Sequence, residues 1–172
     1  MDSVVSGRRS KSTRNSSSDG RSAARRISFR ASSGGSHPTR PQLIGVDASA
    51  LLEALLRTPA AKEVEKWLFD AGHTIHAPHL LDVEVAQVIR RYAANGEIDS
   101  ERGPAALADL ADFPLHRYPH DFLLSRVWDL WNNLTVYDAV YIALAEALDA
   151  PLLTRDRRLA AAAGHHAQIT LA

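Results

Sequence analysis

Four acidic residues occupy positions at which side chains could do chemistry: Asp47, Glu84, Asp138 and Asp156. The first directly follows an apolar run typical of a buried strand, the second lies just beyond the next such run, and the fourth comes right after a third. In parallel α/β sheets, ligands bind in the crevice beyond the carboxyl ends of the strands. We therefore expect these three carboxylates at one edge of a sheet. Asp138 joins them if its helix, which begins near Thr135, points into the crevice.

Four ionised carboxylates in a small crevice repel one another, which raises their pKa values and favours a bound cation. The chain contains no cysteine, so a metal must bind to oxygen or imidazole. Mg²⁺ and Mn²⁺ are hard ions that prefer oxygen ligands and retain water molecules. Such an ion activates water for attack on a phosphoryl group. The residues predict metal-dependent phosphodiester hydrolysis, with one ion or two.

Each acid taken alone also has a structural interpretation, and these interpretations stay open. Asp47 and Asp156 have the positions of helix N-caps, and Thr135 with Asp138 has the spacing of a capping box. Glu84 would be favourable near the positive end of a helix. Two hydroxyl residues, Ser49 and Thr154, each lie two positions from an acid, where they could orient a metal-bound water or cap a helix.

The elements that would position these residues alternate between short apolar runs and longer helical patterns from residue 41 onward. Strands are predicted at 43–46, 73–77, 115–118, 152–154 and 169–171, and helices at 49–56, 61–69, 81–94, 99–111, 121–132, 135–148 and 157–163. This alternation is typical of an α/β fold in which helices flank a central, mainly parallel sheet.

The charges of the chain are segregated although they sum to zero. Residues 1–40 contain nine Arg or Lys against two acids, a net charge of +7, together with twelve serines. Residues 41–172 contain eleven basic side chains against eighteen acids, a net charge of −7. We predict a disordered tail at 1–40, which is an RNA-attracting arm, a transit peptide or an extension without function, and one domain at 41–172. The absence of cysteine and of long apolar runs predicts a cytoplasmic protein without a membrane segment.

Other sites are less consistent with the sequence. A phosphatase with a covalent aspartate needs a second acid where Ser49 stands, and a receiver-like domain needs a late lysine that is missing. The histidines at 73, 76 and 79 are poorly spaced for zinc on a strand. The basic residues Arg155, Arg157 and Arg158 either contact phosphate or balance nearby acids. The three tryptophans, at 67, 128 and 131, are predicted in the core or at an interface rather than as platforms for stacking bases.

The order and spacing of four segments resemble those of PIN-domain nucleases, specifically the VapC-type ribonuclease toxins. The segments are LIGVDASAL at 43–51, APHLLDVEVA at 77–86, NLTVYDAVYIALAEAL at 133–148 and LLTRDRRL at 152–159. The third segment is the most specific, and the resemblance extends from residue 42 to residue 172. The tail at 1–40 has no counterpart in the usual pattern.

This resemblance implies a PIN-like three-layer sandwich in which Asp47, Glu84, Asp138 and Asp156 bind Mg²⁺ or Mn²⁺, with Ser49 and Thr154 as supporting hydroxyls. It also implies a homodimer, cleavage of RNA such as tRNA, rRNA or mRNA, and inhibition by a cognate VapB-type antitoxin that lays a helix along an apolar groove, here expected around 51–56. The alternative is a catalytically silent PIN domain that binds RNA or a protein partner.

Overall fold

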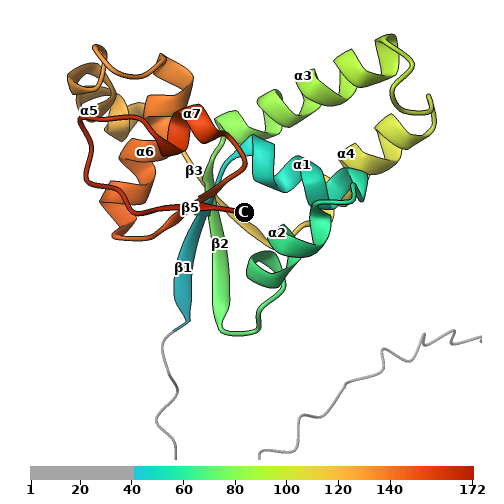
Figure 1. Cartoon of the computed structure of the whole chain (residues 1–172), viewed down its shortest axis with the longest axis horizontal. Helices are drawn as coiled ribbons and strands as arrows, with labels where there is room; N and C mark the ends of the chain where they lie inside the picture. The colour runs from blue at the N-terminus through green and yellow to red at the C-terminus, as the bar shows by residue number, and fades with distance from the viewer. Residues whose placement is uncertain (1–40) are drawn as a thin grey trace, which may run out of the picture. The chain divides into compact units, whose positions relative to one another are not determined.

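A single parallel sheet organises the chain in the computed structural model, which describes residues 41–172. Its strands are β1 (Gln42–Val46), β2 (His73–Pro78), β3 (Leu115–Tyr118), β4 (Leu152–Thr154) and β5 (Ile169–Leu171). They pair in the order β3-β2-β1-β4-β5, and every pairing is parallel (Figure 1). All carboxyl ends therefore meet at one edge of the sheet. The predicted tail at 1–40 lies outside the described residues.

Helices cover both faces of this sheet. They are α1 (Ala48–Leu56), α2 (Ala61–Leu68), α3 (Leu80–Ala94), α4 (Arg102–Asp112), α5 (Leu124–Asp129), α6 (Val136–Leu148) and α7 (Arg157–Ala160), with a 3₁₀ turn η1 (Asp121–Leu123) before α5. The helices α1 to α4 lie on one side of the strands and α5 to α7 on the other (Figure 1). The three-layer α/β sandwich predicted from the sequence is confirmed.

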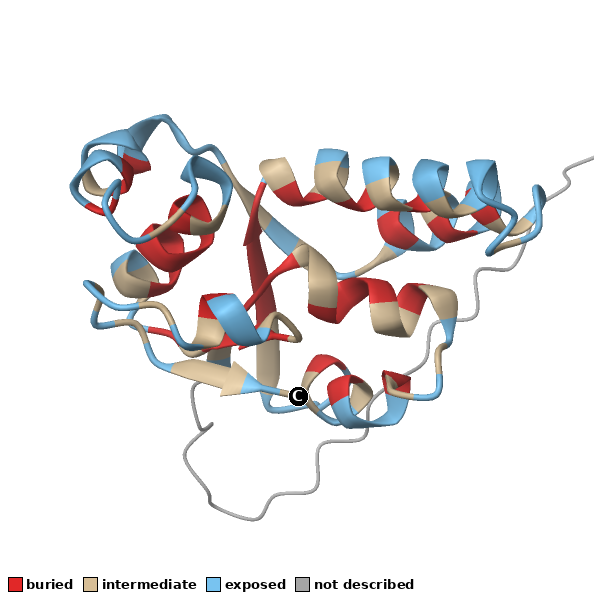
Figure 2. Cartoon of the chain, turned by 45° about the horizontal axis from the view of Figure 1, so that its top comes forward, coloured by how far each residue is buried: buried red, intermediate tan, exposed pale blue. Residues whose placement is uncertain are grey.

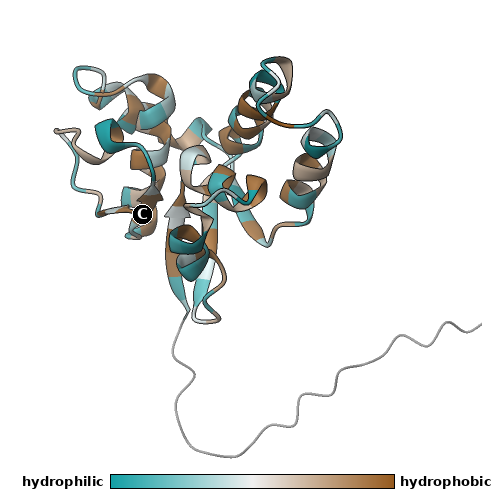
Figure 3. Cartoon of the chain, turned by 45° about the vertical axis from the view of Figure 1, so that its right-hand side comes forward, coloured by the Kyte–Doolittle hydropathy of each residue, from teal (hydrophilic) through white to brown (hydrophobic). Residues whose placement is uncertain are grey.

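Burial explains why these sequences form these elements. At the centre of the sheet, β4 is buried throughout and β1 is buried over its last three residues, as expected for strands covered on both faces (Figure 2). Hydrophobic and hydrophilic residues alternate along the helices, which gives each a buried and a solvent-facing side (Figure 3). The helix α6 is the most buried, with a continuous apolar run from Ala139 to Ala145.

The close approach of β1 and β4 positions the edge at which the acids lie. The amide of Gly45 donates a 2.8 Å hydrogen bond to the carbonyl of Pro151, and a Cβ at Gly45 would lie 3.4 Å from the side chain of Leu152. A larger residue at Gly45 would press on this strand. The amide of Asp47 bonds the carbonyl of Leu153 at 3.2 Å, so the ends of β1 and β4 are tied together.

Two predicted helices are shorter than expected. The pattern at 121–132 becomes η1 and α5, and the amides of Leu130 and Trp131 bond carbonyls three residues back, which tightens the end of α5 into turns. The last helix ends at Ala160 rather than 163, before Gly164 adopts a left-handed conformation with φ of +88°. No helix within residues 41–172 has the length and apolar character required to cross a bilayer.

Candidate active site

A pocket of about 660 Å³ opens at the carboxyl edge of the sheet. All four predicted acids line it, which brings together Asp47, Glu84, Asp138 and Asp156 from three different helix starts and one helix interior. Apolar side chains from α1 and α3 line a further part of the pocket, together with polar side chains from the same helices; the apolar ones include Leu52, Leu56, Leu80, Val83 and Val88. The pocket thus combines a carboxylate cluster with an apolar groove.

Asp47 is the most enclosed of the acids, with 5% of its surface exposed. It is the N-cap of α1, and its Oδ1 accepts a 2.9 Å hydrogen bond from the amide of Ala50. The Ser49 hydroxyl lies 2.8 Å from Oδ1 and 2.9 Å from Oδ2, and the Thr154 hydroxyl donates to Oδ2 at 2.7 Å. Both oxygens of Asp47 are therefore held in one orientation.

The two hydroxyls that bond Asp47 are themselves positioned by the loop after β4. The amide of Arg155 donates to Ser49 Oγ at 2.9 Å, and the amide of Asp156 donates to Thr154 Oγ1 at 2.9 Å. Each hydroxyl accepts a hydrogen bond from a backbone amide and donates one to the Asp47 carboxylate. Ser49 lines the pocket, whereas Thr154 is fully buried behind Asp47, so Thr154 acts on the carboxylate rather than on the pocket contents.

Glu84 lies in the second turn of α3 and is bonded by a residue from the opposite helical layer. The Tyr141 hydroxyl, from α6, donates to Glu84 Oε2. The interaction with the helix dipole is strongest in the first turn. Because α3 begins at Leu80, Glu84 lies beyond that turn and gains little from the dipole. The structure places Glu84 at the pocket wall.

Asp138 and Asp156 are helix-start residues that also face the pocket. Thr135 is the N-cap of α6, accepts from the amide of Asp138 at 3.2 Å and donates its hydroxyl to Asp138 Oδ2 at 2.8 Å. Asp156 is the N-cap of α7, and its Oδ1 accepts from the amide of Arg158 at 2.7 Å. Both residues therefore take part in helix capping and also line the pocket.

Burial and mutual repulsion make the two inner carboxylates difficult to ionise. Burial raises the pKa of Asp47, although hydrogen bonds from Thr154, Ala50 and Ser49 oppose this, and the charge of Asp156 adds to the rise. Burial also raises the pKa of Glu84, opposed by the Tyr141 hydroxyl and increased by the charges of Asp138 and Asp47. A cation in the pocket would relieve both effects.

The donor set fits a hard cation in chemistry but is not drawn together as a finished metal site. Among residues 41–172, no three His, Cys, Asp or Glu side chains are gathered closely enough to hold an ion. In the same range, one carboxylate oxygen each of Glu84, Asp138 and Asp156 has no hydrogen-bond partner. These oxygens, together with those of Asp47, are the ones that a hard cation would bind.

Two charged residues at the pocket carry an ion pair that the sequence pattern did not reveal. The Arg155 guanidinium lies 3.5 Å from Glu53 Oε1 and also donates to the carbonyl of Ala172. Both side chains line the pocket. Arg155 is thus engaged with an acid, one of the two alternatives open from the sequence, while Arg157 and Arg158 are exposed.

The sequence patterns did not single out Tyr141, which lines the pocket and bonds Glu84. Its position three residues after Asp138 places both on one side of α6, and this spacing was the available signal. The three histidines considered for zinc do not converge: His76 bonds Thr74 and Tyr118, and His73 stacks on Trp67.

The core interpretation is wrong for two of the three tryptophans. Trp128 and Trp131 are 74% and 66% exposed, and their rings stack with centroids 6.4 Å apart. The buried residues of this segment are Leu123, Val127 and Leu130, and both indoles lie off that side and face solvent.

Comparison with known proteins assigns the fold to a family. The family model described as PIN domain matches residues 44–165. Ribonuclease VapC1 of Mycobacterium tuberculosis is 46% identical over 127 residues, which cover 73% of this chain and 95% of that protein. Among solved structures, PAE2754 from Pyrobaculum aerophilum has a TM-score of 0.56 at 26% identity, covering 76% of this chain and 83% of that one. VapBC2 from Rickettsia felis, bound to a promoter DNA fragment, has a TM-score of 0.55 at 12% identity, covering 74% and 98%. The chain belongs to the PIN-domain family and, within it, to the VapC ribonucleases.

Proposed function

We propose that this protein hydrolyses phosphodiester bonds of RNA with the aid of Mg²⁺ or Mn²⁺ held by Asp47, Glu84, Asp138 and Asp156. The observation that carries the proposal is the convergence of these four acids on one pocket at the carboxyl edge of the sheet. The membership of the chain in the VapC ribonucleases supports RNA as the substrate.

The residues at this site have different proposed roles. Asp47 is the fixed ligand, because Ser49, Thr154 and the amide of Ala50 hold its oxygens. The other three acids each contribute an oxygen that has no hydrogen-bond partner among residues 41–172. When bound, the cation would lower the pKa of a water molecule and balance the charge that develops on the phosphoryl group. Ser49, which lines the pocket, is placed to orient that water.

The biological role that we propose is that of the toxin in a VapBC-type toxin–antitoxin pair, acting in the cytoplasm as a homodimer. The VapBC2 structure, which shares the fold, supports a VapB-type antitoxin as the partner. The apolar part of the pocket is a suitable groove for an antitoxin helix. Leu52 and Leu56 of the predicted segment 51–56 line it, whereas Leu51 and Leu55 belong to the core.

The test of the chemistry is an incubation of the purified protein with total RNA and Mg²⁺ or Mn²⁺, read on a denaturing gel. We expect discrete fragments that disappear with EDTA and fall by at least about 100-fold for Asp47→Asn. Cleavage that survives both controls would contradict the metal–carboxylate mechanism. RNA binding without cleavage under all metal conditions would favour the silent PIN domain.

The test of the toxin role is expression in a bacterial host. We expect growth arrest that is relieved by co-expression of a small reading frame adjacent to the gene, and normal growth of a strain expressing Asp138→Asn. Unimpaired growth with soluble, active ribonuclease would separate the enzyme activity from the toxin role.

A further inference from the structure

We propose that Tyr141 is a positioning residue of the active site, whose hydroxyl holds the Glu84 carboxylate in the orientation that binds the cation. The inference rests on the proposed function. It assigns a specific task to a side chain that otherwise belongs to the hydrophobic core.

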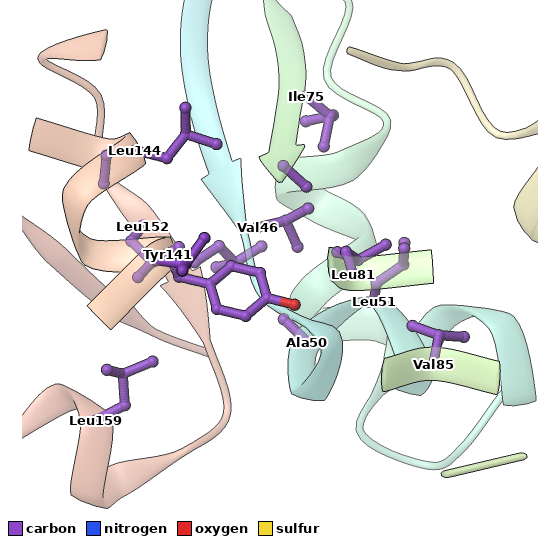
Figure 4. Packing of buried hydrophobic residues seen from close by; sticks show 14 of the residues in the cluster. Val46, Ala50, Leu51, Ile75, Leu81, Val85, Tyr141, Leu144, Leu152 and Leu159 are labelled. Atoms are coloured by element: carbon purple, nitrogen blue, oxygen red, sulfur yellow. The ribbon is translucent and has the colours of Figure 1, made fainter. Parts of the chain in front are cut away.

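The Tyr141 hydroxyl has one side-chain hydrogen-bond partner among residues 41–172. Only 4% of the residue is exposed, and it is packed in the cluster formed by α6, β1, β4 and the helices beyond them. In Figure 4 the ring extends from α6 past Val46, and its oxygen lies on the side of Leu81 and Ala50. The side chain that accepts its hydrogen bond there is Glu84. A buried hydroxyl in such a place is costly unless it is bonded.

The hydrogen bond links the two helical layers at the point where they supply acids. Glu84 belongs to α3 on one side of the sheet, and Tyr141 belongs to α6 on the other. Asp138 lies one turn before Tyr141 on the same side of α6. The bond therefore ties the rotation of Glu84 to the helix that also carries Asp138.

This bond uses only one of the two Glu84 carboxylate oxygens, which leaves the other oxygen available to a cation. Oε2 accepts from Tyr141, and Oε1 has no partner within residues 41–172. Outer-shell donors of this kind orient metal-binding carboxylates, and their removal costs about 10- to 100-fold in metal affinity or activity. Because Tyr141 is only 4% exposed and its hydroxyl donates to Glu84, its loss should affect metal binding and turnover more than RNA binding.

The experiment is calorimetric titration of Mn²⁺ into the full-length wild type and the Tyr141→Phe variant, followed by steady-state kinetics on an RNA substrate. We expect Mn²⁺ affinity to fall about 10- to 100-fold, with kcat reduced and KM for RNA within about threefold of wild type. The matched control is Tyr118→Phe, which removes another partly buried hydroxyl, bonded to His76 at 2.9 Å, that lies away from the pocket. This control should bind Mn²⁺ as the wild type does.

A double-mutant cycle with Glu84→Gln separates positioning from a general loss of stability. If the hydroxyl acts through Glu84, Tyr141→Phe should have little further effect on Mn²⁺ affinity in the Glu84→Gln background. Equal affinity of wild type and Tyr141→Phe, or equal losses in both backgrounds, would overturn the assignment of Tyr141. Failure of the wild type itself to bind Mn²⁺ would overturn the metal site and this inference with it.

Discussion

At the scale of single residues, the same side chains take part in helix capping and in the proposed metal site. Asp47 and Asp156 are N-caps, and Asp138 bonds the N-cap Thr135, yet all three line the pocket. The coincidence follows from the topology, because a helix that follows a parallel strand begins at the edge where ligands bind. A substitution at these positions therefore changes both the local helix start and the site.

Glu84 is the acid at which site chemistry and stability are best separated, because it caps no helix. Its pKa is raised mainly by burial, so the folded protein holds its proton more tightly than the unfolded chain does. The stabilising effect of that proton is complete below the ordinary value of 4.5 and is lost as the pH rises through the folded pKa. The raised pKa therefore makes the free energy of unfolding lower at neutral pH than it would be without the shift.

We therefore predict that Glu84→Gln raises the free energy of unfolding of the metal-free protein at pH 7 by about 0.5–2 kcal/mol. Urea denaturation in EDTA at several pH values would measure this. The difference from wild type should shrink as the pH falls toward 4.5, and Mn²⁺ should stabilise the wild type more than the variant. A variant less stable than wild type at pH 7 would contradict the cost assigned to this charge.

At the scale of elements, a buried ion pair joins α5, α6 and the loop after α7. Arg126 on α5 bonds Glu146 on α6 through two nitrogens, at 2.7 and 3.0 Å. Glu146 also accepts from the amide of His166 at 2.9 Å. Its side chain is 5% exposed and that of Arg126 is 34% exposed. The pair holds the helix that carries Asp138 and Tyr141 against its neighbour.

Removing one partner of this pair should be costly. We predict that Arg126→Met lowers the free energy of unfolding by about 2–3 kcal/mol at pH 7, because the buried Glu146 loses its guanidinium partner and keeps only the contacts with His166. The matched control is Lys66→Met, which breaks an exposed pair with Glu63 and should cost at most about 1 kcal/mol. Burial alone would raise the pKa of Glu146, but the bonds from Arg126 and His166 leave it lowered. The wild-type advantage should therefore be lost as the pH falls through that lowered pKa, and equal losses in the two variants would refute the prediction.

The C-terminal end of α1 offers a stabilising substitution. Arg57 ends this helix with φ of +54°, and its side chain is exposed. Glycine adopts this left-handed conformation without steric cost. We predict that Arg57→Gly raises the free energy of unfolding by about 0.5–1 kcal/mol, measured by urea denaturation. A decrease would indicate that the Arg57 side chain contributes contacts worth more than the strain.

At the scale of the whole molecule, all five strands and the hydrophobic core lie within residues 42–171, whereas the positive charge is concentrated in residues 1–40. We predict that a chain beginning at Pro41 unfolds at the same temperature as the full chain but binds RNA with a weaker dependence on salt. With about 0.7 counterions released per single-strand contact, the nine basic residues limit the change in slope to about 6. Filter binding at several salt concentrations would measure it, and an unchanged slope would show that the tail takes no part.

The sequence predicted those parts of the fold and of the site that depend on local patterns of residues. The strands at 115–118, 152–154 and 169–171 have the predicted bounds, because short apolar runs between turns are local patterns. The convergence of Asp47, Glu84 and Asp156 was predictable from strand ends and parallel topology, whereas that of Asp138 depended on the direction of its helix. The bond from Tyr141 to Glu84 was not, because it joins residues 57 positions apart through packing of the whole sheet. The exposure of Trp128 and Trp131 was missed although a helical signal for it exists: the apolar residues at 123, 127 and 130 form the buried side of this segment and leave both tryptophans outside it.

These exposed indoles also give the protein a built-in optical reporter. Two of its three tryptophans, Trp128 and Trp131, lie side by side in water near the end of α5, while Trp67 is partly buried against the core. Exposed indoles emit at longer wavelengths than buried ones, so the emission spectrum of the folded protein is weighted toward this one surface. Any molecule that covers the end of α5 should shift that emission to shorter wavelengths, without a label and without a change in fold.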